Sequence, residues 1–176
     1  MPDRSLSKES TVYNYTLMKK ITVQLPWVAL YGLILAAAAV FFPFHYGPHG
    51  GRAVLCAFLA MPFLHYMIIR CFIGLSGRLK NQEWGFRLAL PWFGYLPTGY
   101  ITFSSYCSVF RQTLVIGAAS ACLLYVWLPA VYTWVLLAIH LWLMVPHILL
   151  LLRFRKFKSN RGLLRISSKD ASYYLQ

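Results

Sequence analysis

Residues 53–76 read AVLCAFLAMPFLHYMIIRCFIGLS, and Arg70 is the single charged residue among them. An α-helix needs about 20 mainly apolar residues to cross the hydrocarbon core of a bilayer, so this stretch predicts a transmembrane helix. The same pattern is found at residues 21–44, 111–128 and 130–152. A short break at Leu128 and Pro129 separates the last two stretches and predicts a tight helical hairpin. We therefore expect an all-α membrane protein with about four transmembrane helices.

The composition of the whole chain agrees with this prediction. Of its 176 residues, 59% are hydrophobic and 17% are aromatic, which is too apolar for an ordinary soluble domain. Polar residues precede the first apolar stretch and no small-residue cleavage site follows it, so we expect a retained anchor rather than a signal peptide. The predicted parts are a cytoplasmic N-terminal segment (1–20), a four-helix transmembrane domain (21–152) and a basic cytoplasmic tail (153–176).

Basic residues gather on one predicted side of the membrane. The chain has 17 Lys and Arg against 4 Asp and Glu, which gives a net charge of +13. The loop between the first two helices holds only Arg52, and the turn between the last two holds none. Because positive residues favour the cytoplasmic side, both termini of this multi-pass plasma membrane protein are expected in the cytoplasm. The tail residues Arg153, Arg155, Lys156 and Lys158 are expected either to contact anionic lipid headgroups or merely to fix this topology.

The connection between the second and third helices has a different character. Residues 81–110 are apolar and aromatic, but Pro91, Gly94, Pro97 and Gly99 interrupt any spanning helix. The segment GYITFSSY, residues 99–106, alternates in the manner of a strand. We expect a re-entrant or β-hairpin segment packed against the helices, because irregular backbone at membrane depth must be satisfied by protein or water. An interfacial loop with its aromatic residues at the headgroups is the alternative.

Three histidines lie inside predicted transmembrane helices. His65 follows Pro62, which lacks the N–H of a helical hydrogen bond and tends to kink the helix. His140 and His147 lie seven residues apart, on nearly the same helical face but about 10 Å from each other along the axis. At most one of them can therefore share a metal ion with His65. Each histidine can instead be a neutral hydrogen-bonding group between helices.

Other metal-binding side chains are scattered along the chain. The cysteines form no CxxC pair and are expected to be free, buried thiols: Cys56, Cys71, Cys107 and Cys122. His45 and His49 lie in FHYGPHGGR, residues 44–52, where Gly and Pro predict a turn at the outer surface. A solvated turn is the favoured interpretation of these two histidines, and a metal site is the alternative.

The surroundings of His65 resemble an incomplete zinc-peptidase helix. In the zincin pattern HExxH, two histidines one turn apart bind zinc and the glutamate between them polarises the attacking water. With His65 as the first ligand, Tyr66 takes the place of the glutamate and Ile69 takes the place of the second histidine. A phenol is a poor general base at neutral pH and an isoleucine binds no metal, so catalysis by the standard mechanism is not expected.

The order of features along residues 53–176 resembles the DUF3267-type zincin membrane metallopeptidases, a family found mainly in Gram-positive bacteria. The matching segments are LHYMI (64–68), WGF (84–86), the stretch 91–106, FRQ (110–112), MVPHILLL (144–151) and KDASYYL (169–175). In that family an acidic ligand lies on the last helix, and here His147 is near its position. The resemblance implies a degenerate member, lacking the HExxH residues, in a bacterial cell membrane. By the same resemblance, a bound metal would be zinc, held by His65 and His147.

The resemblance and the altered residues together predict a pseudo-metallopeptidase that acts as a partner or regulatory subunit of another membrane protein. The predicted contact surfaces are the small residues Ala36–Ala39 and the aromatic stretch 91–106. The alternatives are a membrane-embedded metallopeptidase with an altered metal site and an accessory subunit of a transporter. An independent transporter is not expected, because Glu83 is the only carboxylate between Glu9 and Asp170. No cofactor is expected other than zinc in the metallopeptidase alternative, and no nucleic acid, since no binding motif accompanies the charge.

Overall fold

The computed structural model describes residues 16–77, 79–80, 82–157 and 162–175. It is mostly helical, as predicted, and three helices are long and apolar enough to cross a membrane, where the sequence predicts about four. These helices are α1 (Leu25–Leu75), α2 (Phe103–Leu123, extended by the 3-10 turn Leu124–Val126) and α3 (Ala130–Phe154, extended by the 3-10 turn Arg155–Phe157). The described residues also form six strands, more than the single β-hairpin segment that the sequence predicts, so the fold is mostly but not entirely helical.

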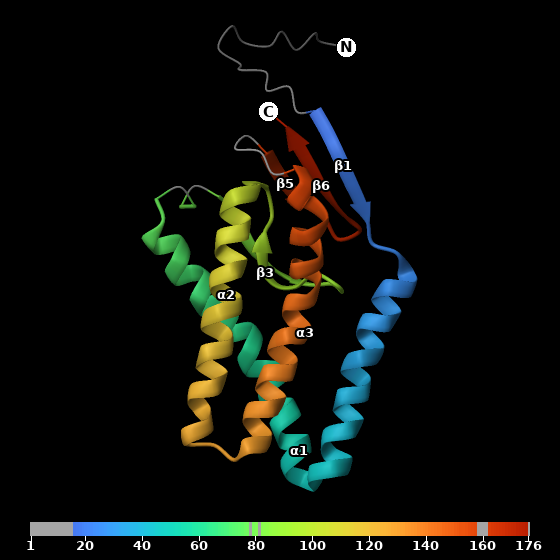
Figure 1. The fold of residues 1–176 in the computed structure, drawn as a ribbon, viewed down its shortest axis with the longest axis vertical. Coiled ribbons are helices and arrows are strands. Elements are labelled where there is room, and N and C mark those ends of the chain that lie inside the picture. The colour runs from blue at the N-terminus through green and yellow to red at the C-terminus, as the bar shows by residue number, and fades with distance from the viewer. Residues whose placement is uncertain (1–15, 78, 81, 158–161, 176) are drawn as a thin grey trace, which may run out of the picture.

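The long helix α1 is bent back on itself at Gly47. This residue has φ 58° and ψ −145°, a backbone conformation that glycine adopts far more readily than other residues. The N-terminal limb (residues 25–46) descends to this point, and the C-terminal limb (residues 48–75) returns diagonally behind α3 and α2 (Figure 1). Gly50 permits the close reversal, since a Cβ atom at this position would overlap the carbonyl oxygen of Phe42. The glycines and prolines of residues 44–52 therefore form the turn that the sequence indicates.

The helix α2 begins earlier than expected. The predicted strand over residues 99–106 is limited to β4 (Tyr100–Thr102), and the helix starts at Phe103 rather than near Arg111. Phe103, Tyr106 and Phe110 recur at helical spacing and are almost completely buried. Packing of this helical face outweighed the strand propensity of the individual residues, which is a common outcome for short segments.

The predicted β-hairpin between the second and third apolar segments is present. Strands β2 (Trp84–Leu88) and β3 (Phe93–Pro97) pair in antiparallel register, with Trp84 opposite Pro97. Ring contacts fasten the hairpin to the C-terminal limb of α1, among them Tyr66 with Tyr95 at 5.0 Å between centroids and Phe58 with Phe93 at 5.7 Å. The hairpin therefore belongs to the helical core rather than to a separate loop.

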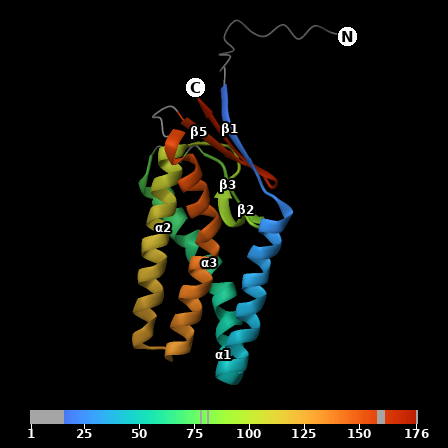
Figure 2. The ribbon, with the colours of Figure 1, turned by 45° about the vertical axis from the view of Figure 1, so that its right-hand side comes forward.

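The two ends of the chain meet in a second sheet. Strands β1 (Thr16–Thr22), β5 (Gly162–Ile166) and β6 (Asp170–Leu175) join β4 in the antiparallel order β1-β6-β5-β4. The sheet lies at the end of the helices opposite Gly47 and the α2–α3 turn (Figures 1 and 2). The boundaries predicted at residues 20 and 153 thus do not separate two independent tails, because β1 pairs directly with β6.

Two contacts fix the packing of the helices. The predicted break at Leu128 and Pro129 does separate α2 from α3, which form an antiparallel hairpin. The N-terminal limb of α1 is joined to α3 by Tyr31 and Trp142, whose rings stack at 4.2 Å. The Tyr31 hydroxyl donates to the Trp142 carbonyl at 3.1 Å, and the Trp142 indole N–H donates to the Tyr31 carbonyl at 2.9 Å.

Candidate functional site: a buried histidine cluster

His65 and His140 meet in the interior of the helix bundle. His65 lies on the C-terminal limb of α1, His140 lies on α3, and their atoms Nε2 and Nδ1 are 2.8 Å apart. The other ring nitrogen of His140, Nε2, lies 3.0 Å from the carbonyl oxygen of Leu114 on α2. His65 is 5% exposed and His140 is 0% exposed, so neither ring has appreciable contact with the surroundings of the bundle. One chain of hydrogen bonds thus connects three helices.

The carbonyl at the end of this chain determines the direction of every bond in it. A carbonyl oxygen can only accept, so His140 Nε2 must carry the proton and donate to Leu114. In the neutral form of His140, Nδ1 is then an acceptor, and His65 Nε2 donates to it. This arrangement satisfies both nitrogens of His140 by protein groups alone.

Gly117 of α2 provides the space for the His140 ring. A Cβ atom placed on Gly117 would lie 2.5 Å from Cε1 and 2.9 Å from Nδ1 of His140. Real carbon atoms do not approach so closely, and any side chain here would displace the imidazole. Sequence reasoning did not identify Gly117, although its position in a run of small residues, GAASA at 117–121, is the type of signal that marks close helix contacts.

His147 has different partners from His65. Its Nδ1 lies 2.8 Å from the hydroxyl of Tyr106, and its ring stacks on Phe110 with 4.1 Å between centroids. Trp92 of the β2–β3 loop lies 6.1 Å away on another side. The structure therefore pairs His65 with His140 and encloses His147 among aromatic rings. Tyr106 is a second member of the cluster that sequence reasoning missed.

The arrangement of metal-binding side chains bears on the expected zinc site. Among the described residues, no group of three or more His, Cys, Asp or Glu side chains lies close enough to hold a metal ion. The two histidines in direct contact are His65 and His140, and a metal held by His65 and His147 stays a prediction. The cysteines are free, but three of them lie on exposed helix surfaces instead of in the core as expected: Cys56, Cys71 and Cys122.

The other two positions of the altered HExxH pattern are used for packing. Tyr66 contacts Phe86 and Tyr95 of the β2–β3 hairpin, with ring centroids 5.2 Å and 5.0 Å away. Ile69 is 1% exposed and belongs to the main hydrophobic core. Both residues therefore contribute apolar contacts where a zincin would need a base and a ligand.

The basic residues of the predicted tail lie at the sheet end of the molecule. Arg153 is in the last turn of α3, and Arg155 and Lys156 follow it in the 3-10 turn, all three with exposed side chains. Lys158 lies outside the described residues. The buried histidines and this basic end are the parts of the predicted site that the structure describes.

Comparisons of the chain with protein-family models, with curated proteins and with solved structures find no match.

Proposed function

We propose that the chain is a non-catalytic, multi-pass membrane protein that acts as a partner or regulatory subunit of another membrane protein. The observation that supports it best is the use of the altered HExxH positions. Tyr66 and Ile69 pack against the hairpin and the core, and His65 donates its hydrogen bond to another histidine. A peptidase site needs a metal with an open position and a base for the attacking water, and these residues offer neither arrangement.

The proposal includes four transmembrane helices. The limbs of α1 on either side of Gly47 would be roughly 33 Å and 42 Å long at 1.5 Å per residue, enough for each to cross a hydrocarbon core of about 30 Å. With α2 and α3 this gives an even number of spans, so both termini lie on one side. The sheet that pairs β1 with β6 supports the same arrangement.

The proposed orientation places the sheet in the cytoplasm of a bacterial cell. Basic residues of elements at that end are Lys19, Lys20, Lys80, Arg87, Arg153, Arg155, Lys156, Arg165 and Lys169, whereas the end at Gly47 has Arg52. This asymmetry is what the positive-inside rule predicts for a cytoplasmic sheet, and the same residues would contact anionic headgroups. The bacterial origin and the zincin ancestry rest on the resemblance of the motifs alone.

The surfaces predicted to contact a partner differ in their availability. The aromatic stretch 91–106 was expected to contact a partner. It lies largely inside the protein, with Trp92 4%, Leu96 1% and Ile101 0% exposed, so little of it is available to a partner. Ala36, Ala37 and Ala39 have exposed side chains on the outer face of the N-terminal limb of α1. Such small residues let a second helix approach closely, which makes this face the appropriate place for a cross-linking probe.

Metal content distinguishes the proposal from its alternative, a metallopeptidase with an altered site. The alternative has one observation in its favour, the close approach of His65 and His140. Elemental mass spectrometry on the detergent-purified protein is expected to find far less than one metal ion per chain, with no difference in His65→Ala or His140→Ala. About one zinc ion per chain, lost in both variants, would overturn the non-catalytic proposal.

Cross-linking tests the binding role itself. A photoreactive amino acid at Ala37 is expected to capture a specific membrane protein at native expression, identified by mass spectrometry. The matched control is Val115 on α2, which is 60% exposed on another face. Recovery of only lipid and self-contacts at Ala37, or of the same proteins at both positions, would contradict a partner on this helix.

A further inference from the structure

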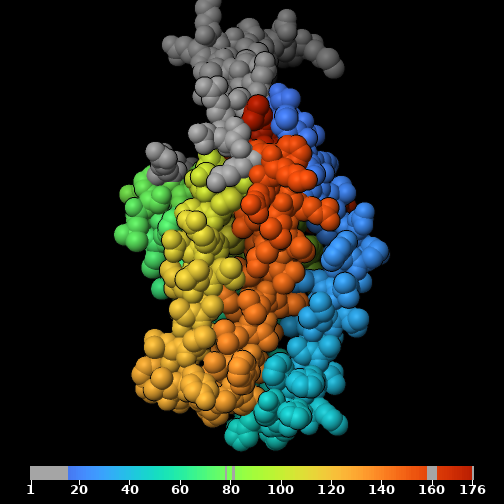
Figure 3. Space-filling model, in the orientation of Figure 1, coloured from blue at the N-terminus to red at the C-terminus, as the bar shows by residue number. Residues whose placement is uncertain are grey.

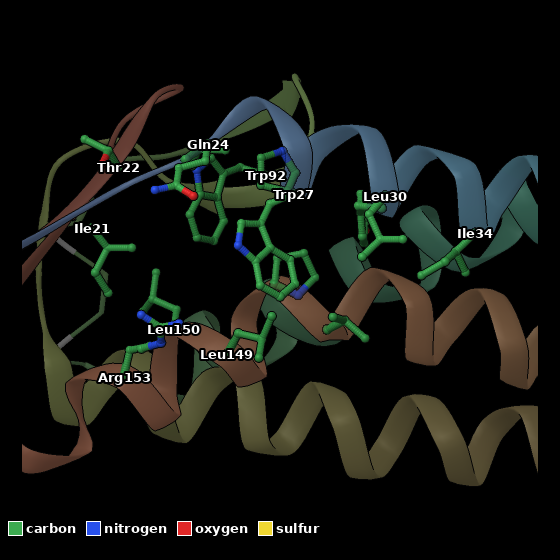
Figure 4. A pocket seen from close by; sticks show the side chains of 15 residues that line it. Ile21, Thr22, Gln24, Trp27, Leu30, Ile34, Trp92, Leu149, Leu150 and Arg153 are labelled. Carbon is green, nitrogen blue, oxygen red and sulfur yellow. The ribbon is translucent and has the colours of Figure 1, made fainter.

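A groove runs between the N-terminal limb of α1 and the helix α3. It has a volume of about 320 Å³, within the range of roughly 300–1,000 Å³ that small-molecule pockets span. Figure 3 shows it as the crease between the two helices, and Figure 4 shows its walls, with Trp27 and Leu30 facing Leu149 and Leu150. These walls are apolar over most of their length. The Tyr31–Trp142 contact joins the two helices beside the groove and so fixes their separation.

One end of the groove is polar and positively charged. Thr22, Gln24 and Arg153 line it where β1 enters α1 and where α3 ends. Arg153 is exposed and has no ion pair with any residue that the structure describes. The described carboxylates are Glu83 and Asp170, and Asp170 is paired with Lys20 at 2.7 Å. Within residues 16–77, 79–80, 82–157 and 162–175, no carboxylate therefore neutralises the guanidinium group.

The groove extends along the helices from the sheet end of the molecule toward its centre, as a lipid extends from its headgroup into the bilayer. From Gln24 to Ile34 the lining extends about 15 Å along the helix axis, from the sheet end toward the centre of the bundle. Both walls belong to helices that are apolar enough to cross a membrane, so the groove opens sideways toward the acyl chains. A ligand that enters from this direction comes from the bilayer and has one apolar and one headgroup end.

We propose that this groove binds one anionic phospholipid, with an acyl chain along the apolar walls and the phosphate at Arg153. The planar guanidinium group forms two parallel hydrogen bonds to a phosphate, a geometry that favours phosphate over a neutral headgroup. Trp92 also lines the groove and adds to its apolar wall. The proposal requires only the membrane location and is independent of the proposed partner role.

Native mass spectrometry of the full-length protein, released from nanodiscs of mixed phosphatidylglycerol and phosphatidylcholine, tests the proposal. The wild type is expected to retain one phosphatidylglycerol per chain in preference to phosphatidylcholine. Arg153→Gln is expected to reduce that preference about fivefold, and Arg153→Lys to restore part of it. Arg155→Gln is the matched control, because Arg155 lies two residues away in the same basic segment but does not line the groove.

A second variant tests the apolar wall separately. Leu149→Trp fills the groove from α3 and is expected to abolish retention of the lipid while Arg153 is unchanged. Equal retention of the two lipids by the wild type would overturn the proposal. So would equal losses in Arg153→Gln and Arg155→Gln, which would show a diffuse effect of charge, or full retention in Leu149→Trp. If a polypeptide occupied the groove instead, the spectrum would show the chain with the added mass of that polypeptide and no lipid, and this result would also overturn the proposal.

Discussion

His140 is the residue on which three helices depend. It accepts a hydrogen bond from His65 of α1, donates one to Leu114 of α2 and lies against Gly117. A polar side chain in an apolar interior is costly unless its hydrogen bonds are made, so these contacts select one arrangement of the helices. The sequence could not distinguish His140 from His147, because residues seven apart share nearly the same helical face. The two histidines differ by about 10 Å along the helix axis, so the axial position of α3 against α1 decides which of them meets His65.

Gly117→Ala is expected to destabilise the protein by about 1–3 kcal/mol. Alanine normally stabilises a helix relative to glycine by about 0.5–1 kcal/mol, but here its Cβ would lie 2.5 Å from a ring that two hydrogen bonds hold in place. Thermal unfolding in detergent measures the effect. Gly74→Ala is the control, because nothing lies within 4 Å of the added atom. A melting temperature of Gly117→Ala at or above that of the wild type would show that the ring is not confined.

The bond between His65 and His140 is expected to appear as a coupling energy in a double-mutant cycle. His65→Leu and His140→Leu should each destabilise the protein, and the double variant should lose less than the sum, by about 0.5–2 kcal/mol. The reason is that either single variant leaves the other histidine without its partner. The control cycle combines His65→Leu with Tyr173→Phe in the terminal sheet and should be additive within about 0.5 kcal/mol. Additivity in the first cycle would contradict the bond.

At the scale of the elements, the sequence predicts local structure well and distant pairing poorly. The long apolar stretches identify the helices, and the glycine and proline residues near Gly47 and Pro129 identify the turns. The terminal sheet was missed because β1 and β6 are short and pair across almost the whole chain, and because the basic residues in and around these segments, such as Lys19, Lys20 and Lys169, suggest tails. In β5 the buried residues alternate along the strand, at Gly162, Leu164 and Ile166. The sequence GLLRI shows no such alternation of apolar and polar residues, so the pattern becomes visible only in the folded sheet. Non-local pairing of this kind leaves a weak signal in a single sequence.

Gly162→Ala is expected to disrupt the terminal sheet. A Cβ atom on Gly162 would overlap the hydroxyl and ring of Tyr173, which is fully buried and donates to the Phe157 carbonyl. Hydrogen exchange should become faster in residues 16–22 and 170–175 while α2 stays protected. Adding Tyr173→Phe removes the overlapping hydroxyl and should restore part of the protection, which separates a steric clash from a general effect of the substitution. Unchanged exchange in Gly162→Ala would contradict this packing of β5 on β6.

At the scale of the whole molecule, polar character and charge are concentrated at one end. The sheet and most basic residues lie there, whereas the opposite end consists of the turns at Gly47 and Pro129 with Arg52. Lys20 and Asp170 form an ion pair within the sheet, and this hydrogen bond raises the pKa of Lys20 above its ordinary value. Lys20 therefore keeps its charge at every physiological pH. Since Asp170 neutralises Lys20, the net positive charge of this end comes from its other basic residues, and this charge suits the end to a negatively charged membrane surface.

The orientation of this charged end can be measured directly. In a variant whose four cysteines are replaced by alanine, Ser168→Cys lies in the exposed β5–β6 turn, and Trp127→Cys lies in the α2–α3 turn. If the sheet is cytoplasmic, a membrane-impermeant maleimide added to intact cells should label Trp127→Cys and leave Ser168→Cys unmodified, and inside-out vesicles should give the reverse. His49→Cys, on the other connection at the same end, is the control and should follow Trp127→Cys. Labelling of Ser168→Cys in intact cells would reverse the orientation, and labelling of His49→Cys together with Ser168→Cys would contradict the crossing of the membrane by both limbs of α1.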